Sequence, residues 1–351
     1  MTGSALALAA LGATPVLAVG TDAGSTITNN VSVGYNVGGV AQTAINASND
    51  IIVDRKINLT VAEVGSVTTT VAPGQLAAVT TFTVTNTSNA TLDFGLSVAE
   101  IAGGTAAHGG TDNFNAAAAP QVFVDSNGNG TYEAGTDLAT FMDEILEDGV
   151  RTVFVVANIP VGQANASVAE VNLIAQARES GVLGTQGAVS AETAGANTAG
   201  VDTVFADIAG SATGDIARDG RHSDDDDYTV LAAQLTVAKQ SRVISDPFNG
   251  TTNPKLIPGA VVEYCIVVTN ASGGGAADSV AISDTLPTQT VGLVGFGPFL
   301  SGTYTGVAPT GTCNADGTST PGALAGNVVS GNLGTIATGT SRTLYFRATI
   351  Q

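Results

Sequence analysis

Apolar and polar residues alternate along most of this chain, which is the pattern of β-strands. The first clear example is a face with period 2 that contains Ile27, Val31, Val33, Tyr35 and Val37. This face predicts one long strand, Gly38-Gly39 predicts a turn after it, and Ile51–Val53 predicts further strand. Because helical periods are scarce, the sequence predicts an all-β fold.

The same alternation predicts strands across the rest of the chain. They are expected at Val67–Val71, Val79–Asn86, Leu92–Val98, Gln121–Val124, Arg151–Ile159, Val168–Arg178, Val261–Asn270, Ser279–Asp284, Val328–Leu333 and Arg342–Ile350. A further strand from Tyr228 to Gln240 is expected to leave one domain and enter the next without a flexible break.

Several short segments occur twice. Leu59–Ala62 returns as Leu235–Ala238, Pro73-Gly74 as Pro258-Gly259, Val84–Asn86 as Val268–Asn270, and Arg151–Ile159 aligns without a gap on Arg342–Ile350. Such self-similarity predicts one structural unit used twice. The interpretation is a first β-sandwich at 59–234 with acidic loop insertions and a second at 235–351. Residues 19–58 form an extra N-terminal strand segment without a counterpart.

The second repeat resembles a known module. Pro258–Tyr264, Val267–Asn270, the turn Ser283–Pro287 and the Gly334…Gly339 turn are similar to the bacterial cell-surface repeat called domain of unknown function eleven. The resemblance covers 235–351 well and 59–159 loosely, where the Asp-Thr-Leu-Pro turn is absent. It implies two tandem immunoglobulin-like β-sandwich domains on a secreted, adhesive or envelope-associated bacterial protein. It implies no catalytic residues.

The chain is strongly acidic, with 30 Asp and Glu against 11 Lys and Arg and a net charge of −19. Without a basic stripe, nucleic-acid binding and attraction to anionic membranes are not expected. Such acidity either keeps a surface protein soluble or serves a design that depends on calcium.

Residues 1–18 are apolar and end in Val16-Leu17-Ala18, a small-residue cleavage pattern. The segment is too short for a comfortable membrane span, and it lacks the positive start of a signal peptide. We interpret it as an export signal, which predicts an extracellular or cell-surface location and no membrane span.

Cys265 and Cys313 both lie in the second repeat. In an exported protein, an even pair within one domain favours a disulfide, and two buried reduced thiols are the alternative. A structural zinc site is not expected, since the cysteines are isolated and the distant His108 and His222 lack ligand spacing.

The best candidate site is an Asn- and Gly-rich loop after a predicted strand. Oxygen-bearing side chains fall at positions 1, 3, 5 and 9 of this loop, Gly130 stands at position 6, and Thr131 at position 7 is expected to offer its backbone carbonyl. The candidate ligands are Asp125, Asn127, Asn129, Thr131, Glu133 and Asp137. Asp137 stands one residue beyond the position where calcium loops of the EF-hand type carry Glu. This pattern predicts a calcium site, and an ordinary Asn/Gly turn is the alternative.

A second acidic stretch carries Asp215, Asp219 and the run Asp224, Asp225, Asp226 and Asp227. Adjacent carboxylates repel one another and need water or a cation. We therefore expect a solvated loop, with a second calcium site as the other interpretation.

No catalytic function is expected. His108 and His222 lie in Gly- or Asp-rich segments without a nucleophile motif, and no phosphate-binding glycine loop occurs. The absence of Trp also argues against a sugar-cleaving site, although paired carboxylates are plentiful.

The extra segment at 19–58 leads to the functional hypothesis. Its strand either completes the sheet of the first domain or is donated to another copy, which would build an extracellular filament or surface layer as a homopolymer. The alternative is a monomeric adhesin, stiffened by calcium, that binds a cell-surface polysaccharide or a protein through loops such as Ala102–Ala119 or Thr288–Gly311.

Overall fold

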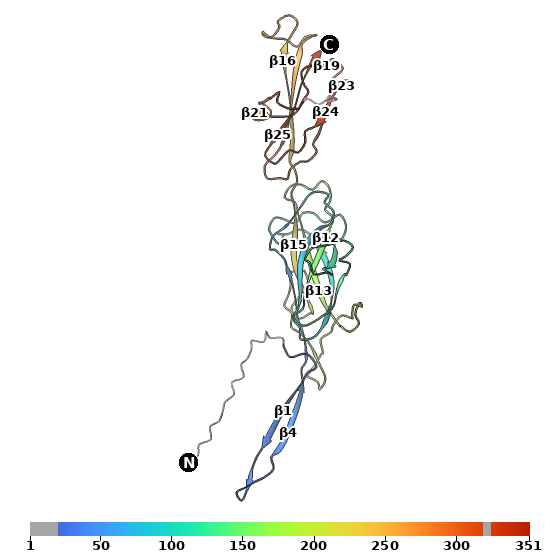
Figure 1. Cartoon of the computed structure of the whole chain (residues 1–351), viewed down its shortest axis with the longest axis vertical. Coiled ribbons are helices and arrows are strands. Elements are labelled where there is room, and N and C mark those ends of the chain that lie inside the picture. Colours follow the sequence, from blue (N-terminus) through green and yellow to red (C-terminus); the bar gives the residue numbers. More distant parts are fainter. Residues whose placement is uncertain (1–19, 319–323) are drawn as a thin grey trace, which may run out of the picture. The chain divides into compact units, whose positions relative to one another are not determined.

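A computed structural model of the protein describes residues 20–318 and 324–351, so the expected export signal at 1–18 lies outside the described residues. Every helix or strand assigned in the described part of the chain is a strand (Figure 1). The predicted all-β fold class is therefore confirmed. Within these same ranges, no helix has the length and hydrophobicity needed to cross a membrane.

The chain divides into two compact units. Unit 1 holds the described residues up to Thr69 together with Gly74–Pro160 and Val168–Thr229. Unit 2 holds Thr70–Pro73, Val161–Ser167 and the described residues from Val230 onward. The sequence had placed a single boundary at 234/235, without the two short excursions.

Two facing sheets make up most of unit 1. The first has the strand order β10 (Gln121–Val124), β12 (Val150–Ala157), β8 (Ala78–Asn86) and β6 (Leu59–Glu63). The second has the order β11 (Phe141–Ile145), β9 (Leu92–Glu100), β13 (Val168–Arg178), β15 (Arg221–Val230) and β7 (Thr69–Val71). A short parallel pair joins β14 (Thr203–Phe205) to β5 (Arg55–Ile57).

The core of unit 1 lies between these sheets. Alternate residues of β8 are buried, as the period-2 pattern predicts. Phe82, Phe94, Phe154 and Tyr228 are fully buried there. The hydroxyl of Tyr228 on the second sheet donates a hydrogen bond to the Val155 carbonyl on the first at 3.0 Å, so the polar end of this large side chain is satisfied in the core.

Unit 2 repeats the arrangement on a smaller scale. One sheet has the order β16 (Leu235–Ser245), β17 (Val261–Asn270), β25 (Ser341–Ile350) and β19 (Thr290–Gly292), and β20 (Phe299–Gly302) also pairs with β25. The other has the order β18 (Ala281–Thr285), β24 (Val328–Asn332) and β23 (Leu324–Ala325). A further small pair joins β21 (Tyr304–Thr305) to β22 (Thr312–Cys313). Leu344 and Phe346 of β25 anchor the core of this unit.

The recurring sequence segments occupy equivalent positions in the two units. Leu59 of β6 lies opposite Asn86 of β8, and Leu235 of β16 lies opposite Asn270 of β17. Arg151 of β12 likewise faces β8 in the register in which Arg342 of β25 faces β17. The three-strand arrangements β6–β8–β12 and β16–β17–β25 are therefore equivalent residue by residue.

A buried asparagine closes the central strand of each unit. The Asn86 side-chain nitrogen donates to the carbonyl oxygens of Ala90, Ile145 and Leu146 at 3.0, 2.9 and 3.2 Å. The Asn270 nitrogen donates to two loop carbonyls in the same way, those of Gly275 and Ile336. Both residues are 0% exposed, so these carbonyl groups satisfy amides that water does not reach.

The predicted continuous strand from Tyr228 to Gln240 is wrong. β15 ends at Val230 and β16 begins at Leu235. The backbone between them hydrogen-bonds to side chains. The N–H of Ala232 donates to the Asn165 side chain, and the N–H of Gln234 donates to the Asn270 side chain. Because these groups bond to side chains, the sheet ladder is interrupted here.

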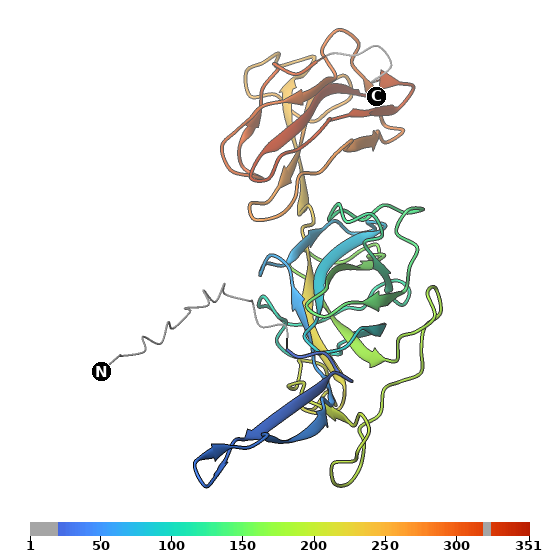
Figure 2. The ribbon, with the colours of Figure 1, turned by 60° about the horizontal axis from the view of Figure 1, so that its bottom comes forward.

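The N-terminal segment forms its own hairpin. β1 (Thr26–Val33) pairs antiparallel with β4 (Ile45–Ile52), and β2 (Asn36–Val37) pairs with β3 (Val40–Ala41) (Figures 1 and 2). The prediction of one long strand from Ile27 to Val37 is therefore wrong, and β1 does not complete a sheet of the first domain. The strand ends at Val33 and finds a partner in a segment whose alternation the sequence analysis had recognised only at its end, from Ile51.

We expect Asn86→Ala to lower the free energy of unfolding by about 2–4 kcal/mol, because it removes three hydrogen bonds of a fully buried amide, among them the buried one to the Ile145 carbonyl. Urea unfolding measures this loss. The control is Thr85→Ala on the other face of the same strand, with an expected change below about 1 kcal/mol. Equal effects of the two substitutions would contradict the role assigned to the Asn86 amide.

Candidate functional site

The β1–β4 hairpin has one apolar and one polar face. Its register places Ile27 opposite Ile51, Val31 opposite Ala47, and Val33 opposite Ile45. These pairs share one face because side chains of a strand alternate between faces. Asn29 and Asn49 face each other in the middle of this stripe. We call the apolar side of β1 and β4 the hairpin face.

The hairpin face is unburied within the chain. Every residue of β1 and β4 is exposed, and Val31 and Ile45 are 55% and 62% exposed. A two-stranded hairpin on its own is at best marginally stable in water. The apolar residues of this face form an exposed surface that Asn29 and Asn49 interrupt, and exposed apolar surfaces are common at interaction sites. All five predicted assembly residues, from Ile27 to Val37, are exposed.

The outer edges of β6 and β16 differ, although the two strands are equivalent in the repeat. In unit 1, the N–H of Val61 donates to the His222 imidazole at 3.0 Å and that of Glu63 to the Asp224 carboxylate at 2.8 Å. Both acceptors come from β15. Side chains of the neighbouring sheet therefore cover this edge of unit 1.

The edge of unit 2 has no such cover among the described residues. Val237 occupies the position of Val61, and outside the ladder with β17 no backbone hydrogen bond is formed by Leu235–Ser245. At 11 residues, β16 is the longest strand with a free edge in either unit. Its side chains are exposed or half-buried along the whole length, and Val237 is 67% exposed. A free edge like this pairs readily with another strand.

The predicted calcium loop brings most of its candidate ligands together. Asp125 accepts the N–H groups of Gly128 and Gly130, both at 2.7 Å, and Asp137 accepts those of Ser126 and Glu133. Asp125 and Asp137 are 5% and 0% exposed. These backbone bonds wrap the loop around two buried carboxylates.

The remaining candidate ligands lie on the exposed side of the same loop. The side-chain nitrogens of Asn127 and Asn129 both donate to one carboxylate oxygen of Glu133, at 2.6 and 3.1 Å. Thr131 bonds through its backbone N–H to Asn129. The three carboxylates of the loop do not lie within 4.8 Å of one another, among the groups that the structure describes. The loop backbone thus folds around its carboxylates, but these carboxylates lie farther apart than the ligands of a bound ion would.

The run Asp224–Asp227 was predicted to be a solvated loop, and this prediction is wrong. All four residues lie in β15, with Asp226 and Asp227 only 2% and 0% exposed. The strand persists because its acids have internal partners: Asp224 accepts the Glu63 N–H and Asp227 the N–H of His108 at 2.8 Å. Hydrogen bonds from neighbouring elements outweigh the low strand propensity of aspartate.

The four aspartates do not form one site. Asp226 faces Glu63 and His108, whose side chain lies 3.3 Å from the Asp226 carboxylate. Asp225 hydrogen-bonds to Glu170 instead, on β13. Sequence reasoning missed Glu63 and Glu170 as members of this region. Their partners are far away in the sequence, and no local spacing marks them.

Burial makes two of these acids weak. Desolvation, followed by the hydrogen bond and the charge of Asp225, raises the pKa of Glu170 to about 7. Desolvation and the nearby charge of Glu63 raise the pKa of Asp226 to about 7, against a backbone hydrogen bond from Asp227 that acts to lower it. Near neutral pH this region therefore holds carboxylates that are only partly ionised.

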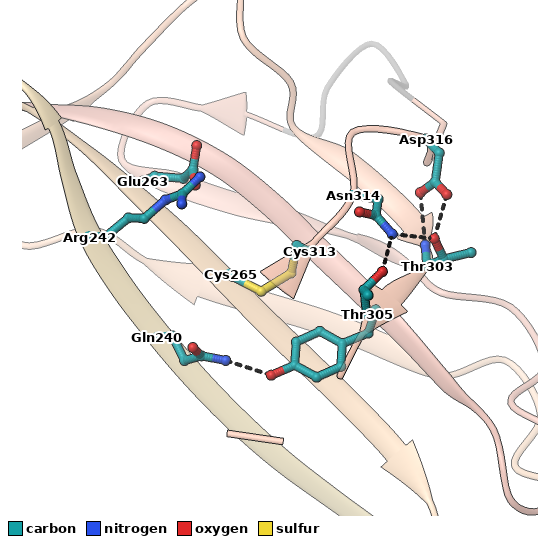
Figure 3. The surroundings of a disulfide bond; sticks show 10 residues. Gln240, Arg242, Glu263, Cys265, Thr303, Thr305, Cys313, Asn314 and Asp316 are labelled. Atoms are coloured by element: carbon teal, nitrogen blue, oxygen red, sulfur yellow. Dashed lines mark hydrogen bonds and ion pairs between the residues drawn. A yellow bond between two sulfur atoms is a disulfide. The ribbon is translucent and has the colours of Figure 1, made fainter. Parts of the chain in front are cut away.

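Unit 2 contains the cysteine pair. Cys265 of β17 and Cys313 of β22 form a disulfide (Figure 3). Beside it, the buried Glu263 carboxylate receives Arg242 at 2.7 Å and Arg347 at 2.8 Å. A cavity of about 60 Å³ is lined by the disulfide together with Arg242 and Glu263. Its volume is far below the roughly 300–1,000 Å³ of small-molecule pockets.

Comparison with known proteins identifies no family for the chain. No protein-family profile and no curated protein matches it. Among solved structures, a chain from Corynebacterium diphtheriae titled "Putative membrane anchored protein" is 10% identical over 93% of this chain and 89% of its own, with a TM-score of 0.20. A likeness at this level carries no argument about function, so the function is argued from the geometry alone.

We expect stability to fall with rising pH in the window set by Glu170. A carboxyl group whose folded pKa is raised from 4.5 to about 7 contributes stability that is complete below pH 4.5 and lost as pH rises through 7. Glu170→Gln should remove this loss, so the variant is more stable than the parent protein at pH 8 and nearly equal to it near pH 4.5. Urea unfolding with chelator between these pH values measures the difference. An unchanged pH slope would contradict the prediction.

Proposed function

We propose that this protein is an exported structural subunit whose copies join end to end into an extracellular filament or surface layer. The observation that carries the proposal is the hairpin face, an apolar surface on two strands without any buried residue. A second copy of the chain is the partner. The contact adds strands of the hairpin to a free sheet edge, which satisfies backbone groups on both sides.

The acceptor in this proposal is the outer edge of β16. It is long enough to receive the eight residues of β1, and the equivalent edge in unit 1 is already covered by side chains of β15. Donor and acceptor are different surfaces of the chain, so the contact is heterologous. Heterologous contacts that do not close into a ring extend into filaments.

The disulfide and the net charge of the chain support a location outside the cytoplasm. The Cys265–Cys313 disulfide uses both cysteines of the sequence, and disulfides persist mainly in oxidising compartments. A net charge of −19 keeps such a protein soluble and is unfavourable for binding nucleic acid. The role is proposed to be structural rather than catalytic.

Calcium is proposed as a stiffening ion in the loop 125–137. Asp125, Glu133 and Asp137 bring three carboxylates to one loop, and no Lys or Arg side chain of the described residues forms an ion pair with them. The amides of Asn127 and Asn129 present nitrogen to Glu133 here and would present oxygen after rotation. Calcium prefers six to eight such oxygen ligands.

We expect Val31→Asp to abolish assembly, because it places a carboxylate in the middle of the proposed contact and a charge buried without a partner is very unfavourable. The association constant should fall at least tenfold. Ser32→Asp is the matched control, since it adds the same group to the polar face of the same strand. Sedimentation velocity and negative-stain imaging report the particle length, and equal loss in both variants would contradict a role of the hairpin face.

Cysteine cross-linking locates the acceptor edge. Both natural cysteines are bonded to each other, so an introduced thiol is the only free one in each chain. A mixture of Asn30→Cys and Thr236→Cys chains should give a disulfide-linked heterodimer. The control pair replaces Thr236→Cys by Thr60→Cys, the equivalent position on the covered edge of β6. Equal cross-linking to both positions would contradict β16 as acceptor, and unlinked monomeric chains would favour the monomeric adhesin.

We expect calcium to raise the unfolding temperature of the chelator-treated protein by several degrees. A ligand at a hundredfold excess over its Kd stabilises a folded protein by about 2.7 kcal/mol. Asp125→Asn and Asp137→Asn should remove most of the calcium-dependent increase. Ser126→Ala, at a loop position outside the ligand pattern, should retain it. A calcium response that survives in Asp137→Asn would place the ion elsewhere.

A further inference from the structure

A different group of ligating side chains lies in unit 1, outside the hairpin face and the loop 125–137. His108 comes from the connection between β9 and β10, Glu63 from the end of β6, and Asp226 from β15. The His108 Nε2 atom lies 3.3 Å from an Asp226 carboxylate oxygen and 3.8 Å from a Glu63 carboxylate oxygen. One donor atom from each residue lies within 4.8 Å of the others.

The imidazole Nε2 atom in this group lies at ion-pair distance from two carboxylates but forms no hydrogen bond. His108 Nε2 is shielded from solvent and has no hydrogen-bond partner, although two carboxylates lie beside it. In a tetrahedral site with metal–ligand bonds of about 2.1 Å, neighbouring donor atoms lie about 3.4 Å apart. The separation of 3.3 Å between His108 and Asp226 matches this value, and the 3.8 Å to Glu63 exceeds it only slightly.

The two carboxylates of this group are already oriented by backbone N–H groups. The other carboxylate oxygen of Glu63 accepts the Ser66 N–H at 2.7 Å, and Asp226 accepts the N–H of Asp227. The backbone N–H of His108 donates to the Asp227 carboxylate at 2.8 Å, which holds the loop, but not the imidazole itself, beside β15. Such supporting hydrogen bonds are typical of metal ligands, because they hold the donor atoms in place.

The carboxylates around the group outnumber the basic side chains beside them among the described residues. Glu63, Asp112, Glu170 and Asp224–Asp227 lie in this part of unit 1, and no Lys or Arg of the described residues forms an ion pair with any of them. Buried carboxylates are normally paired with a cation or coordinated to a metal. His108 is the only basic side chain in contact with them among the described residues.

We propose that Glu63, His108 and Asp226 bind a divalent transition metal ion of the zinc class. Imidazole nitrogen with carboxylate oxygen suits zinc, whereas calcium and magnesium prefer oxygen ligands alone. The ion joins β6 of one sheet, β15 of the facing sheet and the loop at Ala102–Ala119. Its role is to fasten this loop to the sandwich, with a fourth coordination position left for water.

The test is titration of the chelator-stripped full-length protein with zinc chloride by isothermal calorimetry, in buffer with excess calcium to saturate oxygen-only sites. We expect one zinc ion per chain with a micromolar or smaller Kd. His108→Gln and Glu63→Gln should each weaken binding at least tenfold. The control is Asp143→Asn, in the carboxylate cluster formed with Asp93 and Glu144, which has no imidazole and should bind zinc like the parent protein.

Limited proteolysis gives a second readout that does not depend on heat of binding. Zinc should protect the loop Ala102–Ala119 in the parent protein and in Asp143→Asn, but not in His108→Gln. Circular dichroism of the metal-free variants checks that each of them folds. The proposal is overturned if the parent protein binds no zinc, if His108→Gln binds it with unchanged affinity, or if Asp143→Asn loses binding as His108→Gln does.

Discussion

An open sheet edge exposes backbone N–H and C=O groups that need partners, and the two units meet this requirement in different ways. In unit 1, His222 and Asp224 reach from β15 to the edge of β6 and accept its outward N–H groups. In unit 2, the equivalent edge of β16 carries no such acceptors among the described residues. One repeat is thus completed internally, and the other keeps a surface on which a further strand can form.

Much of the sheet architecture could be predicted from sequence. The recurrence of Leu-Thr-Val-Ala and Val-Thr-Asn marked two strands that pair in the same register in both units. Alternate side chains of these strands fill the core on one face, and the buried Asn donates to loop carbonyls at a fixed position. Both requirements allow little variation in the sequence of the strands. By contrast, the break between β15 and β16 could not be predicted, because its backbone N–H groups donate to side chains that are far away in the sequence.

The candidate sites were harder to predict because their residues are joined by the fold rather than by spacing. Four consecutive aspartates indicated a solvated loop, yet β15 carries them into the interior, where N–H groups from β6 and the His108 loop satisfy two of them. Glu63, His108 and Asp226 carry no shared local motif, and only the packing of two sheets and a loop brings them together. The loop 125–137 was recognisable because all of its candidate ligands are neighbours in sequence.

The paired Asn29 and Asn49 would affect the register in which a second molecule binds to the hairpin face. On a uniformly apolar stripe, a second molecule could shift by two residues with little loss of binding free energy. An amide pair half-way along disfavours every alignment that covers it with methyl groups, as a single polar residue does in a coiled-coil seam. In the proposed assembly, the polar interruption would therefore weaken the contact somewhat and make one spacing between successive molecules the most stable.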